Sequence, residues 1–240
     1  MRSRSKAAVS HPQKACCEWI VPVNRPLIAV LDYGIGNLYS AQKSLQRMGG
    51  DARLTADPKL IADAAGVVLP GVGAFRPCMQ ALKRSGLDEL AHSVIGDDRP
   101  FLGICIGLQL LYEGSEEAPD TAGLGILSGT IELLRGNVKR PQMQWNRLDC
   151  GVIATSGDTP SDAGIHPLLQ GLDGAWVYFV HSYAAPMAAN VVAVCDYGGP
   201  VAAVVAENNV CATQFHPEKS ARSGLRLLAN FVRQAQAAVT

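Results

Sequence analysis

The feature that most constrains this chain is a cysteine placed between two glycines at the end of an apolar run. Residues 101–104 read as a buried strand, Cys105 follows at once, and residues 108–112 carry apolar side chains at helical spacing. Gly103 lies two residues before the cysteine and Gly107 two residues after it. Small residues at these places let a strand turn sharply into a helix, which exposes the central side chain on a strained corner. The segment therefore predicts a nucleophile elbow at Cys105.

Two interpretations of Cys105 stay open at this point. As a nucleophile, its thiolate would be favoured by the N-terminus of the following helix, where backbone N–H groups are free. As a structural residue, it would be a buried thiol, which is the commonest fate of a free cysteine. A base within hydrogen-bond reach of the sulfur would favour the first interpretation.

Strands and helices alternate through the first half of the chain, which favours a doubly wound parallel sheet. Strands are expected at residues 27–31, 66–69 and 101–104, with helices between them. The second half is richer in strands joined by short connections, which predicts antiparallel additions to the sheet. These strands are expected at residues 125–134, 144–148, 175–184, 191–197, 201–207 and 210–215. We expect an α/β fold with a mostly parallel central sheet flanked by helices, formed by residues 27–240 as a single domain.

Composition excludes several classes of function. The chain has 240 residues, of which 48% are hydrophobic, and its basic and acidic residues are equal in number; this balance argues against a nucleic-acid partner. No apolar run reaches the roughly 18 residues that a membrane span requires. The seven cysteines include no Cys-x-x-Cys pair, so neither a disulfide framework nor a zinc site is expected. A reducing, cytoplasmic location fits best.

Residues 1–26 differ from the rest of the chain. They carry five basic residues against one acidic residue and show no periodicity. They also lack the apolar core of a secretory signal. We expect a disordered extension or a start codon assigned too early, with an organelle transit segment as the alternative.

A glycine pair, Gly34-x-Gly36, follows the first expected strand. A dinucleotide-binding turn requires a third glycine, and Tyr39 stands at that position. The pair therefore predicts a tight turn, and no cofactor or metal ion is expected.

The best candidate base for Cys105 is His216, with Glu218 as the group that orients it. In an extended segment, the side chains of residues two apart point to the same side, and Pro217 favours an extended conformation at His216. The alternative is a surface turn with a solvated glutamate. The other histidines compete poorly, although His181 ends an expected strand and could line a site.

Six motifs together resemble the class I, triad-type glutamine amidotransferases, and within them the glutaminase subunits of imidazole glycerol phosphate synthase. The resemblance covers the chain from about residue 27 to its end. The motifs are Asp32-Tyr33-Gly34-x-Gly36-Asn37-Leu38, Leu69-Pro70-Gly71-Val72-Gly73-Ala74-Phe75, Gly103-Ile104-Cys105-x-Gly107-x-Gln109-Leu110-Leu111, Trp145-Asn146, Tyr178-Phe179-Val180-His181-Ser182-Tyr183 and Gln214-Phe215-His216-Pro217-Glu218-Lys219-Ser220. The resemblance implies a flavodoxin-like fold and hydrolysis of L-glutamine.

By resemblance, Cys105 is the nucleophile, His216 its base and Glu218 the orienting carboxylate. The oxyanion would be held by the backbone N–H of Ile106 and by a second N–H from the loop after the second expected strand. The second donor would be that of Val72 or Gly73. Glycines on both sides would allow a peptide flip in this loop, which could switch the site on when the partner is loaded.

The resemblance also implies a substrate pocket and a partner. The pocket for the amino-acid end of glutamine would contain Gln109, Glu117, Ser182 and Tyr183, although Glu117 has the alternative of a solvated surface acid. Ammonia would pass to a (β/α)8-barrel cyclase subunit (HisF) in a heterodimer, which makes imidazole glycerol phosphate and AICAR. The residues that match partner-facing positions are Met143, Trp145, Asn146, Tyr178 and Lys219.

One departure from the family pattern concerns this partner-facing segment. The family usually reads Pro-His-Met-Gly-Trp-Asn, whereas this chain has Gln142 and Gln144 at the second and fourth positions. The departure bears on the docking surface and leaves the triad residues unaffected. Two other functions stay open, namely an amidotransferase subunit of another synthase, such as one that modifies nucleotide-linked sugars, and a catalytically silent scaffold.

Overall fold

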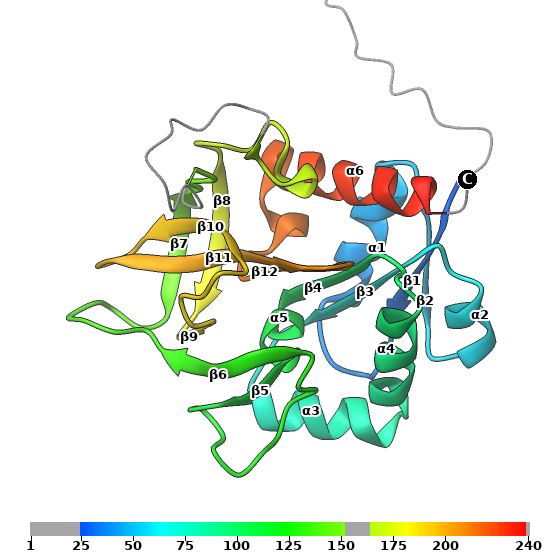
Figure 1. The fold of residues 1–240 in the computed structure, drawn as a ribbon, viewed down its shortest axis with the longest axis horizontal. Coiled ribbons are helices and arrows are strands. Elements are labelled where there is room, and N and C mark those ends of the chain that lie inside the picture. The colour runs from blue at the N-terminus through cyan, green and yellow to red at the C-terminus, as the bar shows by residue number, and fades with distance from the viewer. Residues whose placement is uncertain (1–24, 152–163, 239–240) are drawn as a thin grey trace, which may run out of the picture.

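The structure, a computed structural model, describes residues 25–151 and 164–238 (Figure 1). The expectations for residues 1–24 lie outside the described residues. The first half contains β1 (Leu27–Leu31), α1 (Leu38–Arg47), β2 (Asp51–Thr55), α2 (Pro58–Ala62), β3 (Gly66–Gly71), α3 (Phe75–Arg84), α4 (Leu87–Gly96), β4 (Phe101–Cys105), α5 (Ile106–Leu110) and β5 (Tyr112–Ser115). The second half contains β6 (Leu127–Leu133), β7 (Gln142–Arg147), the 3₁₀ helix η2 (Pro167–Leu169), β8 (Trp176–His181), β9 (Tyr183–Ala184), β10 (Val191–Asp196), β11 (Pro200–Glu207), β12 (Val210–Thr213), the 3₁₀ helix η3 (Pro217–Lys219) and α6 (Ala221–Ala237).

A seven-stranded sheet forms the centre of the fold, in the order β10-β11-β12-β4-β3-β1-β2. The five strands from β12 to β2 pair in parallel, while β10, β11 and β12 pair antiparallel. Strands β3 and β4 are buried along their whole length, as expected for parallel strands covered on both faces. The predicted sheet, mostly parallel with antiparallel additions in the second half, is confirmed.

Helices cover the central sheet on both faces. Figure 1 shows α1 and α6 on one face and α3 and α4 on the other. Leu45 of α1 and Leu228 of α6 belong to one core cluster, and Leu82 of α3 and Ala91 of α4 belong to the second. No helix within the described ranges is long and apolar enough to cross a membrane.

The parallel pairing brings three segments together at the carboxyl edge of the sheet. Gly71, the last residue of β3, pairs with Cys105, the last residue of β4. On the other side of β4, Ile104 pairs with Thr213 at the end of β12. The loop after β3, the turn after β4 and the segment after β12 therefore meet where ligands bind in sheets of this kind.

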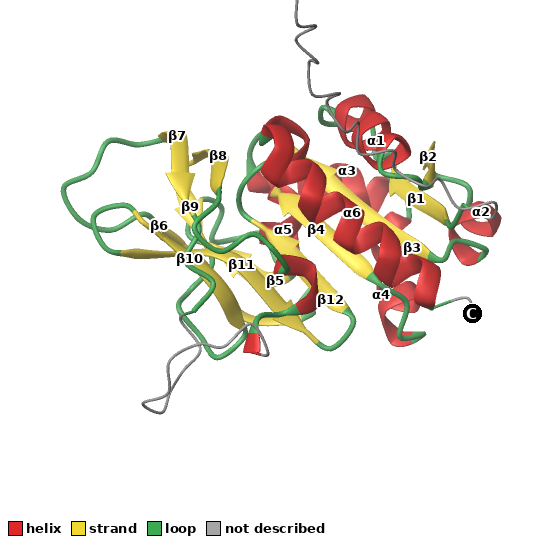
Figure 2. Ribbon diagram, turned by 90° about the horizontal axis from the view of Figure 1, so that it is seen from above, coloured by secondary structure: helices red, strands yellow, loops and turns green. Residues whose placement is uncertain are grey.

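Two smaller units lie beside the central sheet. Strands β5, β6 and β9 form a three-stranded sheet, and β7 and β8 form an antiparallel ribbon. Figure 2 shows the β7–β8 ribbon apart from the helices that cover the central sheet. In the ribbon Met143 pairs with Val180 and Trp145 with Tyr178.

Two local features differ from the sequence prediction. The helix after Cys105 ends at Leu110, and Tyr112 begins a strand instead of continuing the helix. The helix ends here because the carbonyl groups of Leu110 and Leu111 accept hydrogen bonds from residues 124, 126 and 127. Strand β2 was not expected, since its sequence Asp-Ala-Arg-Leu-Thr has little strand propensity; it forms as an edge strand through its pairing with β1.

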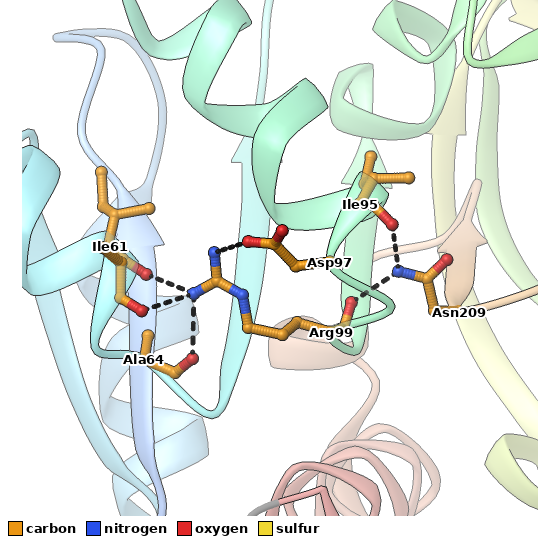
Figure 3. Close-up of polar contacts among 7 residues, drawn as sticks. Ile61, Ala64, Ile95, Asp97, Arg99 and Asn209 are labelled. Atoms are coloured by element: carbon orange, nitrogen blue, oxygen red, sulfur yellow. Dashed lines mark hydrogen bonds and ion pairs between the residues drawn. The ribbon is translucent and has the colours of Figure 1, made fainter.

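The opposite, amino-terminal edge of the sheet is held by side chains that bind backbone carbonyl groups (Figure 3). Arg99 Nη1 donates to three carbonyls around the end of α2, those of Ile61, Ala62 and Ala64. Asn209, in the turn between β11 and β12, donates to the carbonyls of Ile95 and Arg99 at 3.0 and 2.8 Å. These contacts fix the start of β4 between its neighbours.

Candidate active site

Cys105 stands at a strained turn between β4 and α5. Its φ of 54° and ψ of −107° are unusual for a residue with a side chain. A Cβ on Gly107 would lie 1.8 Å from the carbonyl oxygen of Leu69, and a Cβ on Gly103 would lie 2.9 Å from that of Gly107. Only glycine fits at either position, which explains the Gly-x-Cys-x-Gly spacing. Because α5 has only five residues, its dipole is weaker than the longer expected helix would supply.

His216 and Glu218 form a buried pair after β12. The Nδ1 atom of His216 lies 2.8 Å from Oε1 of Glu218, and the two side chains are 1% and 4% exposed. The extended geometry expected for this segment holds at His216 but ends there, because Pro217 begins the 3₁₀ turn η3. The turn still brings the carboxylate onto the imidazole. The alternative of a solvated glutamate is excluded by this burial.

The second ring nitrogen of His216 is available for chemistry. Nε2 is buried, and no hydrogen bond of ordinary geometry joins it to another of the described residues, although Cys105 lies near enough to interact with the ring. Burial lowers the pKa of His216, but interactions with Cys105 and Glu218 outweigh it and raise the pKa to about 10. The imidazole can therefore hold a proton that it has taken from the thiol.

Ser220 joins the turn that contains His216 and Glu218 to the β7–β8 ribbon. Ser220 Oγ donates to the carbonyl of His216 at 2.7 Å and accepts from the backbone N–H of Tyr178 at 2.9 Å. The N–H of His216 donates in turn to the carbonyl of Tyr178 at 3.1 Å. Strand β8 therefore sets the position of His216 directly.

A cavity of about 310 Å³ lies over Cys105. It brings together nearly all of the predicted catalytic and substrate-binding residues, while Glu218 lies behind His216. Its lining residues are Val72, Gly73, Cys105, Ile106, Gln109, Glu117, Pro141, Val180, His181, Ser182, Tyr183 and His216. Val72, Cys105 and His216 meet here, although they are far apart in the sequence, because they follow or end the adjacent strands β3, β4 and β12.

Two glutamines form a hydrogen-bonded chain at the base of this cavity. Gln109 Nε2 donates to the carbonyl of Tyr183 at 3.0 Å and to Oε1 of Gln214 at 3.3 Å. Gln214 Nε2 in turn donates to Cys105 Sγ at 3.8 Å. With both amide hydrogens of Gln109 engaged, its oxygen is left to accept a hydrogen bond from a ligand.

Glu117 lies at the rim of the cavity and is partly buried. Its Oε2 accepts a hydrogen bond of 2.8 Å from the backbone N–H of Phe75 at the start of α3. One carboxylate oxygen is thus fixed by the fold, and the other can accept from a cationic ligand group. This placement argues against the interpretation of Glu117 as a freely solvated acid.

The loop after β3 is held from outside the cavity. Tyr33 donates to the carbonyl of Pro70 at 2.9 Å, and the thiol of Cys78 donates to the carbonyl of Val72 at 3.6 Å. Burial raises the pKa of Cys78 to about 11, so this thiol stays protonated. Because a trans peptide points its C=O and the next N–H in opposite directions, the N–H of Gly73 points away from Cys78.

Comparisons with known proteins agree with this geometry. A family model described as glutamine amidotransferase class-I matches residues 29–235. This chain belongs to the class I glutamine amidotransferases. The family resemblance predicted from the motifs is confirmed.

Several relatives share much more sequence with this amidotransferase than a common fold alone would explain. It is 46% identical over 215 residues to "Imidazole glycerol phosphate synthase subunit HisH" of Syntrophotalea carbinolica, covering 85% of this chain and 98% of the relative. It is 45% identical over 223 residues to the protein of the same name from Synechococcus elongatus, covering 89% and 95%. A solved structure titled "Structure of PurLQS from Thermotoga maritima" is similar in fold, with a TM-score of 0.63, 18% identity and coverage of 90% of this chain and 100% of that one.

The predicted partner-facing residues of the amidotransferase lie outside the cavity, on or beside the β7–β8 ribbon. Met143 and Trp145 point outward and are 63% and 44% exposed, and Trp145 contacts Tyr178 edge-to-face with ring centroids 6.1 Å apart. Lys219 is exposed in η3. Asn146 points to the other side of the ribbon, where it donates to the carbonyl of Asp196 at 2.8 Å.

Two polar residues around the site of the amidotransferase, Gln214 and Gln142, were missed as functional candidates. Gln214 lies two residues before His216, and its proximity to Cys105 follows from the parallel pairing of β12 and β4. His181, which the sequence suggested could line a site, does line the cavity. Gln142 was noted only as a departure from the family pattern. The alternation of residues along β7 was the available signal, because it turns Gln142 inward next to outward-facing Met143.

Proposed function

We propose that this chain is the glutaminase subunit of imidazole glycerol phosphate synthase. It hydrolyses L-glutamine to glutamate and ammonia, and passes the ammonia to a cyclase subunit in histidine biosynthesis. The observation that carries the chemistry is that Cys105 and His216 border one cavity, with the carboxylate of Glu218 buried against His216 Nδ1. The names of the relatives support the choice of synthase.

The first half of the reaction forms a thioester on Cys105. The thiol gives its proton to Nε2 of His216, and the sulfur attacks the side-chain amide carbon of glutamine. Glu218 keeps Nδ1 protonated and stabilises the imidazolium, as the third member of a triad does. The imidazolium then donates its proton to the leaving nitrogen, ammonia departs, and a γ-glutamyl thioester remains.

The second half releases glutamate. A water molecule gives a proton to Nε2 of His216 as its oxygen attacks the thioester carbon. The tetrahedral intermediate collapses, the C–S bond breaks, and the proton returns to the sulfur. His216 therefore acts first as base and then as acid in each half.

Backbone donors would stabilise the oxyanion in both halves. The N–H of Ile106, the residue after the nucleophile, is one candidate, as in other elbows. For the second donor, the hydrogen bond from Cys78 to the Val72 carbonyl favours the N–H of Gly73, since that group points away from α3. Removing one such donor typically costs about 3–4 kcal/mol of transition-state stabilisation.

The far end of the cavity would hold the amino-acid group of glutamine. The free oxygen of Gln109 and the second carboxylate oxygen of Glu117 suit the α-ammonium group. Ser182 and Tyr183, which continue β8 into β9, complete this wall of the cavity.

The acceptor of the ammonia would be a (β/α)8-barrel cyclase subunit (HisF) bound to the outer face of the β7–β8 ribbon. The exposed side chains of Met143 and Trp145 give this face its apolar character. We propose that residues 27–240 act as one amidotransferase domain in this heterodimer, in the cytoplasm.

Reconstitution with the barrel subunit tests the function. We expect the two chains to copurify and to form imidazole glycerol phosphate in a glutamine-dependent reaction. Cys105→Ala should abolish that reaction while leaving the ammonia-dependent one intact, and the matched control Cys211→Ala, at a buried thiol outside the cavity, should leave both intact. Glutaminase activity without binding to the barrel would indicate another synthase, and full activity of Cys105→Ala would refute the proposed chemistry.

A further inference from the structure

Gln142 lies at the point where the partner-facing ribbon meets the cavity. It is the first residue of β7 and has no exposed surface. One end of its side-chain amide, assigned as Oε1, lies 3.0 Å from Nε2 of His181. The other end, assigned as Nε2, lies 3.7 Å from the sulfur of Cys195. A buried amide held on both sides in this way is fixed in place by its partners.

The protonation of His181 determines how Gln142 binds it. Burial lowers the pKa of His181 to about 4, although its hydrogen bond with the Tyr183 carbonyl raises it in part. The ring is therefore neutral near pH 7 and carries one proton. Because the Tyr183 carbonyl can only accept, that proton is on Nδ1, which lies 2.9 Å from the carbonyl oxygen.

The unprotonated Nε2 then needs a donor. An amide can present either its oxygen or its NH2 group by a half turn, and the surrounding network decides between them. The neutral ring requires the NH2 group of Gln142 to face Nε2, and the amide oxygen then accepts from the Cys195 thiol. In this arrangement the hydrogen-bonding groups of Gln142, His181 and the Tyr183 carbonyl are paired with one another while the imidazole stays neutral.

The carbonyl of Tyr183 links His181 to Gln109, a residue of the proposed substrate pocket. It accepts from His181 on one side and from Nε2 of Gln109 on the other. Gln109 continues through Gln214 to Cys105. The chain of contacts therefore runs from the inner face of β7 to the oxygen of Gln109, which faces the cavity.

We propose that Gln142 is a positioning residue for glutamine binding, acting through His181 and the Tyr183 carbonyl on Gln109. The inference rests on the proposed glutaminase function. It predicts that loss of the Gln142 amide displaces groups that contact the amino-acid end of glutamine, whereas Cys105, His216 and Glu218 keep their positions. The effect should therefore fall on KM for glutamine and not on kcat.

The test compares two variants that carry the same substitution. Gln142→Met keeps the length of the side chain but cannot donate, and Gln80→Met makes the same change at an exposed position on α3, away from the ribbon and the cavity. Both are assayed as full chains with saturating barrel subunit. We expect Gln142→Met to raise KM for glutamine about tenfold with kcat within about threefold, and Gln80→Met to leave KM within about twofold. Gln142→His, which restores a ring N–H donor, should return KM to near the wild-type value.

Nitrogen NMR of the wild-type chain with labelled histidine provides a readout that a merely structural role would not give. We expect His181 to be neutral, with its proton on Nδ1, from pH 8 down to about pH 5 (near its lowered pKa), and to lose this single tautomer in Gln142→Met. An unchanged KM in Gln142→Met, a fall in kcat alone, or a wild-type His181 protonated on Nε2 would overturn the inference. An inactive wild-type pair would instead overturn the proposed function, and the NMR result would still decide the state of His181.

Discussion

The buried pair of His216 and Glu218 makes the sharpest quantitative prediction. Glu218→Gln keeps the size of the side chain and its acceptor oxygen but removes its charge. The 2.8 Å contact with Nδ1 then changes from a charge-assisted hydrogen bond to a neutral one. Because the two side chains are almost fully buried, solvent does not screen this change.

The magnitude follows from the two kinds of hydrogen bond. A hydrogen bond to a charged group contributes about 1.5–3 kcal/mol and a neutral one about 0.5–1.5 kcal/mol. The loss of about 1.4 kcal/mol corresponds to about one pKa unit. We therefore expect the pKa of His216 to fall from about 10 by about one unit in Glu218→Gln. Glutaminase kcat should fall by about 10²–10⁴-fold, since an amide can also orient the ring in its wrong tautomer.

Two measurements check this prediction. A pH titration of His216 by NMR gives its pKa in the wild type and the variant, and glutaminase assays with the barrel subunit give kcat. Glu89→Gln, at an exposed position on α4, serves as the control and should change neither value. A His216 pKa and a kcat that both stay at wild-type values in Glu218→Gln would refute the assigned role of this pair.

Four further predictions follow from other contacts. Gly107→Ala places a methyl group against the Leu69 carbonyl and should lower the free energy of unfolding by about 3 kcal/mol in urea denaturation. Ser220→Ala leaves the buried backbone N–H of Tyr178 without its acceptor and removes one of two hydrogen bonds to the His216 carbonyl, and it should cost about 1–3 kcal/mol of stability while lowering kcat. Asn209→Ala removes two hydrogen bonds at the opposite edge of the sheet and should cost about 1–2 kcal/mol with kcat unchanged. The pKa of His181 is lowered from 6.5 in the unfolded chain to about 4 in the folded one. Its neutral ring therefore contributes about 3 kcal/mol to the free energy of unfolding above pH 6.5, and this contribution is lost as the pH falls toward 4. Urea denaturation between pH 7 and pH 4 should show a weaker loss in His181→Asn.

Each of these has a result that contradicts it. Wild-type stability in Gly107→Ala would mean that the elbow is not sterically closed. A kcat effect of Asn209→Ala equal to that of Ser220→Ala would mean that the two edges of the sheet are not independent. A His181→Asn variant that loses stability with acid as steeply as the wild type would assign the acid sensitivity to other groups.

Much of the fold was predictable because its signals are local. The parallel strands β3 and β4 are continuous apolar runs, and Cys105 lies between two glycines that no other residue can replace. Strand β2 and the early end of α5 were not predictable, because each is decided by hydrogen bonds to a segment elsewhere in the chain. The intrinsic propensity of a short segment does not depend on such distant partners and so cannot predict them.

The candidate site divides in the same way. The Gly-x-Cys-x-Gly segment and the His-Pro-Glu turn are short motifs, so their residues could be found from the sequence, and sheet topology explains why Cys105 and His216 share a cavity. Strand alternation could place Gln142 on the inner face of β7, but the role proposed for it could not be found from the sequence, since that role depends on a contact between β7 and β8 and on burial that lowers the pKa of His181. The partner-facing role of Asn146 stays a prediction, although strand alternation turns its side chain away from that of Trp145 toward the carbonyl of Asp196.

Peptide mapping of a rapidly quenched reaction tests the central claim most directly. The reconstituted pair is mixed with glutamine, quenched in acid during turnover, digested, and examined by mass spectrometry. We predict a γ-glutamyl adduct on the peptide that contains Cys105, and none in Cys105→Ala. An active enzyme that forms its adduct on another residue, or that keeps its activity without Cys105, would contradict the account.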